Sequence, residues 1–266
     1  MKEKIAIIGA GQLGTALAFA LKEAGFPIAG IASRTLSSAE FLAQKTGAHA
    51  TPLPHTLLPK ADIFFFTAPD DLIPSICEDL VAHATDELST KTFFHCSGSL
   101  PASILSSAKE KNASIGSMHP LQTFTHLYEK TPQNLFTGTL FAIDGDLAAQ
   151  QLATQIVHLL GGVPIELTAD QKAIYHTAAV LVSNYAATLF ETALSLFETI
   201  GIDRQKGLPA LATLSEVALQ NIKQTDPVCA LTGPIARGDV LTVSRHMDAL
   251  QKQAPQFLLT YRELGL

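Results

Sequence analysis

The sequence is poor in cysteine. Its 266 residues include three cysteines, Cys77, Cys96 and Cys229, which lie far apart and form no Cys-x-x-Cys pair. An odd number of scattered cysteines favours reduced thiols over a disulfide framework, and we therefore expect a cytoplasmic protein. The histidines show no paired metal-ligand spacing, so we also expect no metal site.

Charge and long apolar runs are scarce as well. Charged residues make up 16% of the chain, with a net charge of −6 and no basic run to neutralise phosphates, so we expect no nucleic-acid partner. No apolar stretch reaches the ~18 uninterrupted residues that a membrane span requires, and we expect no membrane partner. The apolar N-terminus resembles a signal peptide, but glycines interrupt it. A soluble globular protein is expected.

Short apolar runs alternate with helical patterns over the first two thirds of the chain. Strands are predicted at 4–9, 27–32, 62–67, 91–95, 113–117, 140–144 and 163–167. Helices are predicted at 12–24, 37–46, 72–83 and 147–160. This alternation predicts an α/β fold with a doubly wound parallel sheet of the Rossmann type.

Beyond Thr168 only helical patterns follow. We expect helices at 170–200, 204–223 (interrupted near Pro209), 235–250 and 255–264. The boundary is therefore placed at Leu167, between a dinucleotide-binding domain (1–167) and an all-α substrate and dimerisation domain (168–266). The helix at 170–200 is apolar nearly all round, which predicts burial within its own domain or against a second subunit. We expect a homodimer.

A glycine-rich motif follows the first predicted strand. Gly9, Gly11 and Gly14 match G-x-G-x-x-G, with Gln12 and Leu13 between them, directly before a helix. The first glycine permits the tight turn, the second admits the pyrophosphate, and the third lets helix and strand pack closely. The phosphates then meet the N–H groups at the helix N-terminus. This context predicts a dinucleotide site.

The end of the second strand indicates which dinucleotide binds. An NAD site places an acidic residue there to hold the ribose hydroxyls. This chain instead has Ser33, Arg34 and Thr35, which can bind a 2′-phosphate. The alternative is a solvated loop arginine. The missing acid favours NADP(H).

Two further segments lie at predicted strand ends, where ligands bind in open α/β sheets. Thr67, Ala68 and Pro69 follow one strand, and we expect them to line the nicotinamide cleft. The backbone of Ser97 and Gly98 follows the next strand and could hold a substrate carboxylate or carbonyl. Ordinary strand-to-helix loops are the alternative for both segments.

Several residues could transfer a proton. His119 follows a predicted strand and could donate to a carbonyl oxygen, although it could equally be an ordinary loop histidine. Lys172 begins the long helix near the domain boundary, and His176 and Asn184 share its face. A buried lysine beside a cationic cofactor ring would have a lowered pKa. The alternative is a solvated lysine at a helix start.

One further candidate lies in a helix junction. The segment from Thr232 to Asp239 is dense in glycine, proline and charge. Arg237 in this segment could hold a carboxylate. The alternative is that Arg237 forms a surface ion pair with Asp239, which would contribute little to stability.

These motifs together resemble bacterial proteins that combine a Rossmann-like domain with a C-terminal domain of unknown function, number 2520. The resemblance covers nearly the whole chain and rests on Gly9–Gly14, Ser33–Thr35, His95–Leu100, Gly116–Gln122, Lys172–Asn184 and Thr232–Asp239. It implies an NADP-dependent oxidoreductase. Some similar proteins act as an alternative type of ketopantoate reductase in pantothenate synthesis.

The wider superfamily includes pyrroline-5-carboxylate reductases, hydroxyacid dehydrogenases and prephenate dehydrogenases. Hydroxyacid dehydrogenases carry an asparagine four residues after the lysine, whereas His176 follows Lys172 here. The His119-Pro120 pair is similar to the His-Pro of prephenate dehydrogenases.

We therefore predict an NADPH-dependent reductase that passes hydride to the carbonyl of a small 2-keto acid, with ketopantoate as the first candidate. Lys172, with His119 or His176, would protonate the oxygen, while Arg237 or the Ser97–Gly98 backbone would hold the carboxylate. The alternatives are an imine reductase of the pyrroline-5-carboxylate type and a non-catalytic NADP-binding sensor.

Overall fold

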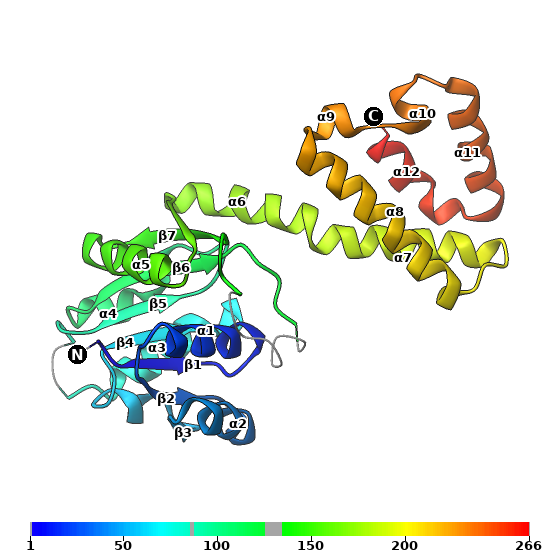
Figure 1. The fold of residues 1–266 in the computed structure, drawn as a ribbon. Helices are drawn as coiled ribbons and strands as arrows, with labels where there is room; N and C mark the ends of the chain where they lie inside the picture. Colours follow the sequence, from blue (N-terminus) through cyan, green and yellow to red (C-terminus); the bar gives the residue numbers. More distant parts are fainter. Residues whose placement is uncertain (1, 86–87, 126–134, 266) are drawn as a thin grey trace. The chain divides into compact units, whose positions relative to one another are not determined.

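The computed structural model describes residues 2–85, 88–125 and 135–265. The chain divides into two compact units, Met1–Ala179 and Val180–Leu266 (Figure 1). Each unit is described by itself. The boundary predicted at Leu167 remains a prediction about which part folds alone, because the first turns of the helix that follows it belong to the first unit.

An eight-stranded sheet forms the centre of the first unit, with the order β3-β2-β1-β4-β5-β6-β7-β8. Its strands are β1 (Ile5–Ile8), β2 (Ile28–Ala32), β3 (His49–Thr51), β4 (Ile63–Phe66), β5 (Thr92–His95), β6 (Ser114–Pro120), β7 (Leu140–Gly145) and β8 (Val163–Glu166). The strands from β3 to β6 are all parallel. The predicted α/β fold is confirmed.

Helices cover both faces of this sheet. Their bounds are α1 (Gln12–Glu23), α2 (Leu36–Thr46), η1 (Pro54–Leu57), η2 (Asp70–Leu72), α3 (Ile73–Ala82), η3 (Ala102–Leu105), α4 (Ser106–Glu110) and α5 (Leu147–Leu159). Residues of α1, α2 and α5 share one apolar core, and residues of α3 and α4 share a second one.

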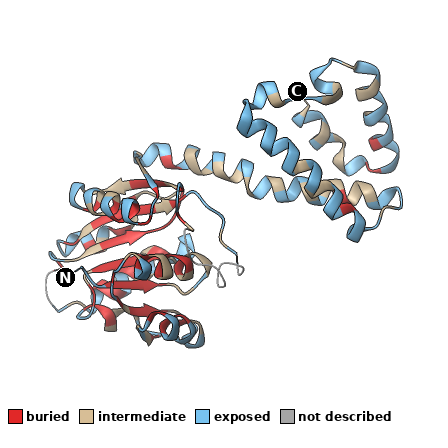
Figure 2. Ribbon diagram, viewed as in Figure 1, coloured by how far each residue is buried: buried red, intermediate tan, exposed pale blue. Residues whose placement is uncertain are grey.

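Side chains alternate between these two cores along each strand. In β4, Phe65 lies in the first core, whereas Phe64 and Phe66 lie in the second. In β5, Phe94 and Phe93 divide in the same way. A parallel strand that is covered on both faces is apolar throughout. The continuous apolar run in the sequence therefore predicted such a strand. Figure 2 shows the buried strands in red.

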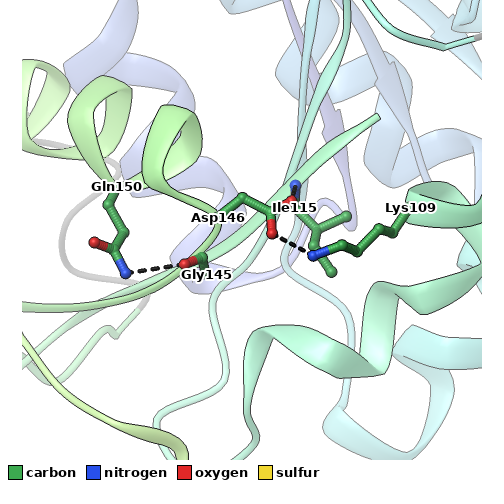
Figure 3. A network of polar contacts seen from close by, with 5 residues as sticks. All are labelled: Lys109, Ile115, Gly145, Asp146 and Gln150. Atoms are coloured by element: carbon green, nitrogen blue, oxygen red, sulfur yellow. Dashed lines mark hydrogen bonds and ion pairs between the residues drawn. The ribbon is translucent and has the colours of Figure 1, made fainter. Parts of the chain in front are cut away.

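The sequence predicted a parallel sheet, but the observed sheet is not parallel throughout. Strand β7 pairs with β6 in the antiparallel direction, and β8 follows β7 in parallel. The junction is held by Asp146, which accepts a hydrogen bond from the Ile115 N–H and forms an ion pair with Lys109 (Figure 3). Gly145 has a φ of +131°, and an added Cβ would lie 2.3 Å from the Ile115 carbonyl oxygen. Only glycine fits this turn.

Helices alone build the second unit. After α6 (Ala169–Val182), which crosses into it, come α7 (Asn184–Thr199), α8 (Arg204–Gln224), α9 (Pro227–Ala230), α10 (Gly233–Ala236), α11 (Val240–Gln253), η5 (Pro255–Phe257) and α12 (Leu258–Leu264). The interruption predicted near Pro209 is wrong, because α8 continues through this residue. A single residue, Ser183, separates α6 from α7.

The second unit buries little of its apolar surface. Within its described part, residues 180–265, four residues are buried: Leu194, Gly207, Leu250 and Ala254. Large apolar side chains such as Leu214, Val228 and Leu241 are exposed. In Figure 2 this unit is mostly pale blue. Exposed apolar surface of this extent is typical of an interaction site.

The stretch Ala169–Thr199 is also apolar enough, by length and composition, to cross a membrane. It has a mean hydropathy of 1.3 over its best window, of which 6% is buried. The first turns of this stretch carry polar side chains that bond to the first unit, as described below. The cytoplasmic placement remains a prediction.

Candidate active site

A groove of about 530 Å³ opens at the carboxyl ends of strands β1, β2 and β4. Its wall includes Gly9 and Gly11 from the first loop, Ser33–Thr35 from the second, and Thr67–Pro69 from the third. Eight of the eleven residues predicted to bind the cofactor therefore line one groove. The carboxyl ends of parallel strands are where α/β sheets bind nucleotides.

The three glycines of the motif have different surroundings. A Cβ on Gly9 would lie 2.8 Å from the Thr67 backbone, and φ at Gly9 is +118°. A Cβ on Gly14 would lie 2.0 Å from the Gly9 carbonyl oxygen, so this glycine lets α1 approach the turn. By contrast, Gly11 has nothing within 4 Å of its Cβ position. The backbone of Gly11 is therefore open to a pyrophosphate, as the motif requires.

Thr67 fixes the glycine turn from the neighbouring strand end. Its hydroxyl donates to the Gly9 carbonyl oxygen at 2.7 Å, and its N–H donates to the Ile8 carbonyl oxygen at 2.8 Å. Gln12, Leu13 and Gly14 begin α1 and are not among the lining residues. They form the helix N-terminus, whose N–H groups would bind the phosphates of the cofactor.

A second polar cluster follows strand β5, around the loop that begins at Ser97. The Asp70 carboxylate accepts a hydrogen bond from the Ser97 hydroxyl at 2.6 Å. Asp70 directly follows Pro69, a lining residue of the groove. The Ser97 hydroxyl oxygen in turn accepts from the N–H of Leu100 at 3.1 Å. The loop is therefore tied to the end of the cofactor groove.

His95 holds the same loop through two hydrogen bonds. Its Nδ1 accepts from the Ser97 N–H at 3.2 Å, so the ring proton lies on Nε2, which donates to the Pro101 carbonyl oxygen at 3.1 Å. The side chain is completely buried. Burial, together with the nearby charge of Lys172, lowers the pKa of His95 to about 3. His95 is therefore neutral and positions the loop.

Lys172 enters this cluster from α6. Its Nζ donates to the Ser117 hydroxyl at 2.7 Å and to the Ser97 carbonyl oxygen at 3.3 Å, and the residue is completely buried. Burial lowers the pKa of Lys172, while the charges of Asp144 and Asp70 act in the opposite direction. The ammonium is enclosed by the protein, and its two hydrogen bonds connect the loop at Ser97 to strand β6.

His119, at the end of β6, is partly exposed beside two side chains of α6. Its Nδ1 lies 3.1 Å from the Tyr175 hydroxyl, and its ring meets the His176 ring edge-on with centroids 5.7 Å apart. Burial raises the pKa of Tyr175 to about 12, so its hydroxyl is protonated and can donate to Nδ1. This contact holds the His119 ring against α6.

Gly98 packs against both histidines. A Cβ on it would lie 2.4 Å from His176 Cδ2 and 2.8 Å from His119 Nε2. Burial and the nearby His176 and Lys172 lower the pKa of His119 to about 4. Beside the buried Lys172 ammonium, the cluster therefore presents the neutral His119 ring and the protonated Tyr175 hydroxyl, together with the exposed Asp70 carboxylate.

Two predicted site residues lie in the second unit. Asn184 begins α7, and Arg237 follows α10 as an exposed residue. Asp239 caps α11 by accepting from the Thr242 hydroxyl at 2.8 Å and from its N–H at 3.1 Å, and these two bonds, with a smaller contribution from the charge of Arg237, lower the pKa of Asp239. The roles predicted for Asn184 and Arg237 remain predictions.

The sequence did not single out Tyr175 or Asp70. Tyr175 lies three residues after Lys172, the spacing that places two side chains on one helix face. Asp70 directly follows the Thr67–Pro69 segment that the sequence did identify. Both signals were present in the sequence, although neither points to chemistry without a hydrogen-bond partner from another element.

The first part of the chain matches a known protein family. Residues 4–91 match the family described as "NADP oxidoreductase coenzyme F420-dependent". The chain is an NADP-dependent oxidoreductase. Residues 139–266 match the family of the domain of unknown function 2520, so the resemblance inferred from the motifs is confirmed. NADP(H) is thus the cofactor of this oxidoreductase, and the residues lining the groove would hold it.

Solved structures share its fold along the whole chain. A Bacteroides fragilis protein named as a candidate NADP oxidoreductase is 24% identical with a TM-score of 0.81, covering 99% of this oxidoreductase and 96% of its own chain. A Thermotoga maritima protein is 25% identical with a TM-score of 0.76, and the match covers 98% of this chain and 95% of that protein. An imine reductase from Myxococcus stipitatus is 18% identical with a TM-score of 0.63, covering 99% and 94%. No curated protein matches the sequence.

Proposed function

We propose that this oxidoreductase reduces the C=N bond of a small imine. The carrying observation is the neutral His119 ring beside the protonated Tyr175 hydroxyl, combined with the enclosure of Lys172. When bound, NADPH supplies a hydride and leaves as NADP⁺. A protonated imine brings its own proton, so addition of hydride to its carbon gives the amine without a further proton donor.

Reduction of a carbonyl makes a different demand on the protein. Hydride addition to C=O leaves an alkoxide, which must take a proton from a positioned acid. With a pKa of about 4, His119 carries no proton to spare near neutral pH. Lys172 is enclosed by Ser97 and Ser117, so its proton could reach a substrate only through the Ser117 hydroxyl or after a rearrangement.

The protein's own groups have separate roles in this proposal. His119, held by Tyr175, offers a ring nitrogen to the substrate, and Gly98 leaves room for the two histidine rings. His95 and Asp70 hold the loop whose Ser97 and Gly98 backbone faces a substrate carboxylate. Lys172 positions Ser117 and the Ser97 carbonyl group. Proteins of the same fold include imine reductases and a pyrroline carboxylate reductase with NADP bound, which supports the imine class.

A screen of NADPH oxidation tests this proposal. The purified protein would be given cyclic imines, including pyrroline-5-carboxylate, and 2-keto acids, including ketopantoate. We expect turnover with cyclic imines and its loss in His119→Phe, which excludes a contaminating enzyme. Turnover of ketopantoate alone would establish the second candidate, the keto-acid reductase. Tight NADPH binding without turnover of any compound would indicate a sensor.

We also propose that the protein is a homodimer joined through its second unit. The four buried residues within 180–265 cannot form a core for so many apolar side chains, and a second copy presents an equally apolar surface. Light scattering should give twice the monomer mass of 28.3 kDa. Leu214→Glu should weaken the dimer, whereas Leu147→Glu, an equally exposed change in the first unit, should not. A detergent-free monomer, or a protein soluble only in detergent, would contradict this proposal.

A further inference from the structure

Three potential metal ligands meet on the first unit, at the edge of the cofactor groove and apart from the cluster around Lys172 and His119. They are His55 in η1, Asp79 near the end of α3 and His83 just after α3, and one ligand atom from each lies within 4.8 Å of the others. We propose that His55, Asp79 and His83 bind a divalent transition metal ion such as Zn²⁺. The sequence spacing predicted no such site, because residues far apart in the chain form it.

The hydrogen bonding of His83 leaves one ring nitrogen available. Its Nδ1 lies 2.7 Å from the backbone carbonyl oxygen of Asp79. A carbonyl oxygen only accepts, so Nδ1 carries the ring proton and Nε2 has a free lone pair. Metal-bound histidines commonly donate their second N–H to a carbonyl group in this way, which orients the ring.

One ring nitrogen of His55 lacks a hydrogen-bond partner in the described part of the chain. Among the residues that the structure describes, its Nδ1 is a buried side-chain atom without any hydrogen-bond partner. Such an atom costs free energy, because it has given up its hydrogen bonds to water. Rotation of the ring onto a bound ion would convert this unpartnered imidazole into a ligand.

The two imidazole rings are already at a suitable separation. They stack with centroids 3.9 Å apart and planes 10° apart. Two nitrogens bound at ~2.0–2.1 Å to one tetrahedral ion lie roughly 3.3 Å apart. The nearly parallel rings must open by rotation about χ2 to direct both lone pairs at one ion, and that torsion has broad minima in histidine. The rotation falls to His55, because turning His83 would break its hydrogen bond to the Asp79 carbonyl oxygen.

The ligand set and its position favour a cation of the zinc class. Two imidazoles and one carboxylate suit Zn²⁺ and its neighbours, whereas Mg²⁺ and Ca²⁺ prefer oxygen ligands. His83 caps the C-terminal end of the ten-residue helix α3, where the helix dipole favours positive charge. Asp79 and Pro54, the neighbour of His55, both line the cofactor groove. A bound ion would therefore join η1 to α3 in the groove wall.

Titration of the metal-free full-length protein tests the site. Calorimetry with Zn²⁺ should show one saturable site per chain with a low-micromolar or tighter Kd. Co²⁺ should give the visible spectrum of a tetrahedral nitrogen and oxygen site. His83→Ala and His55→Ala should each weaken Zn²⁺ binding at least ~tenfold. If His55→Ala unfolds, Asp79→Asn takes its place, because Asp79 is exposed. Circular dichroism would verify folding.

His158→Ala is the matched control, because His158 is also exposed in the last turn of a helix, α5. It should leave Zn²⁺ binding unchanged, as should Cys229→Ser, which removes the one exposed thiol among the described residues. Absence of saturable binding would overturn the proposal. So would undiminished affinity in folded His83→Ala and Asp79→Asn, or a sulfur-to-cobalt charge-transfer band.

Discussion

Lys172 of α6 donates its shortest hydrogen bond, 2.7 Å, to the hydroxyl of Ser117 on β6. Its second acceptor, the Ser97 carbonyl oxygen, is neutral as well. A buried ammonium held by two neutral acceptors is only partly compensated for its lost hydration, and burial accordingly lowers the pKa of Lys172. This contact connects three segments of the site.

Lys172→Met should lower turnover by up to about a hundredfold, the cost of misplacing groups at a site by about 1 Å, and leave NADPH affinity nearly unchanged. The lysine lies away from the glycine loop but holds the loop and strand that carry Gly98 and His119. Steady-state kinetics with the substrate found in the screen, together with fluorescence titration of NADPH, would measure both effects. Ser117→Ala, which keeps the ammonium, should cause a smaller loss. Turnover within a few-fold of the parent would exclude a role for Lys172.

Gly98→Ala should reduce turnover at least ~tenfold while NADPH still binds, because the new Cβ would meet His176 and His119 well inside contact distance. The two rings would have to move apart. Adding His176→Ala removes the nearer obstacle, so the double variant should regain part of the thermal stability lost in Gly98→Ala. A single variant with normal kinetics and normal Tm would contradict this packing.

Acid should destabilise the protein through His95 and His119. Their folded-state pKa values, about 3 and about 4, lie below the value near 6.5 of the unfolded chain. Below about pH 6.5 the unfolded chain therefore binds more protons, and stability falls as the pH falls. Urea unfolding should show a loss of about 2–4 kcal/mol between pH 7.5 and pH 5 from the two together.

The variant His119→Asn should show a smaller acid loss, because one of the two titrating groups is gone. Unfolding free energies would be compared within each variant between the two pH values, so a constant effect of the substitution cancels. Equal stability of the parent protein at both pH values would show that neither histidine is buried in its neutral form.

Arg34→Ala should reduce the preference for NADPH over NADH by about ten- to a hundredfold, since a charge-assisted hydrogen bond contributes roughly 1.5–3 kcal/mol. Arg34 lines the groove beside Ser33 and Thr35, and no acidic residue follows β2 there. Fluorescence titration with both dinucleotides is the measurement. Arg245→Ala, in α11 outside this groove, should change neither affinity. Equal affinities in the parent protein would contradict the assignment.

Local pattern predicted most of the fold. The apolar runs of β1 and β4 and the glycine motif depend on neighbouring residues alone, so the sequence shows them directly. The three-residue strand β3 lacks such a run. The reversed direction of β7 depends on Asp146 and Gly145 meeting Ile115 from another segment, which no local pattern contains. Pro209 was taken as a break, yet α8 continues through it.

The candidate site was predictable where one loop carries it. Ser33 to Thr35 and Thr67 to Pro69 were each identified from a strand end. The partners of His119 and Lys172 were not, because Tyr175 and Ser117 acquire their meaning only when α6 lies against β6. Long-range hydrogen bonds of this kind join residues more than fifty positions apart.

Helix α6 has a consequence for how this gene can be divided. The dinucleotide groove is built entirely from residues before Pro120, whereas Lys172, Tyr175 and His176 arrive on a helix whose last turn belongs to the second unit. A fragment ending at Leu167 would keep every groove-lining residue and lose all three of these side chains. Recombination at that point would therefore produce a dinucleotide receptor without a reductase, and a hybrid enzyme should be joined after Ala179 instead.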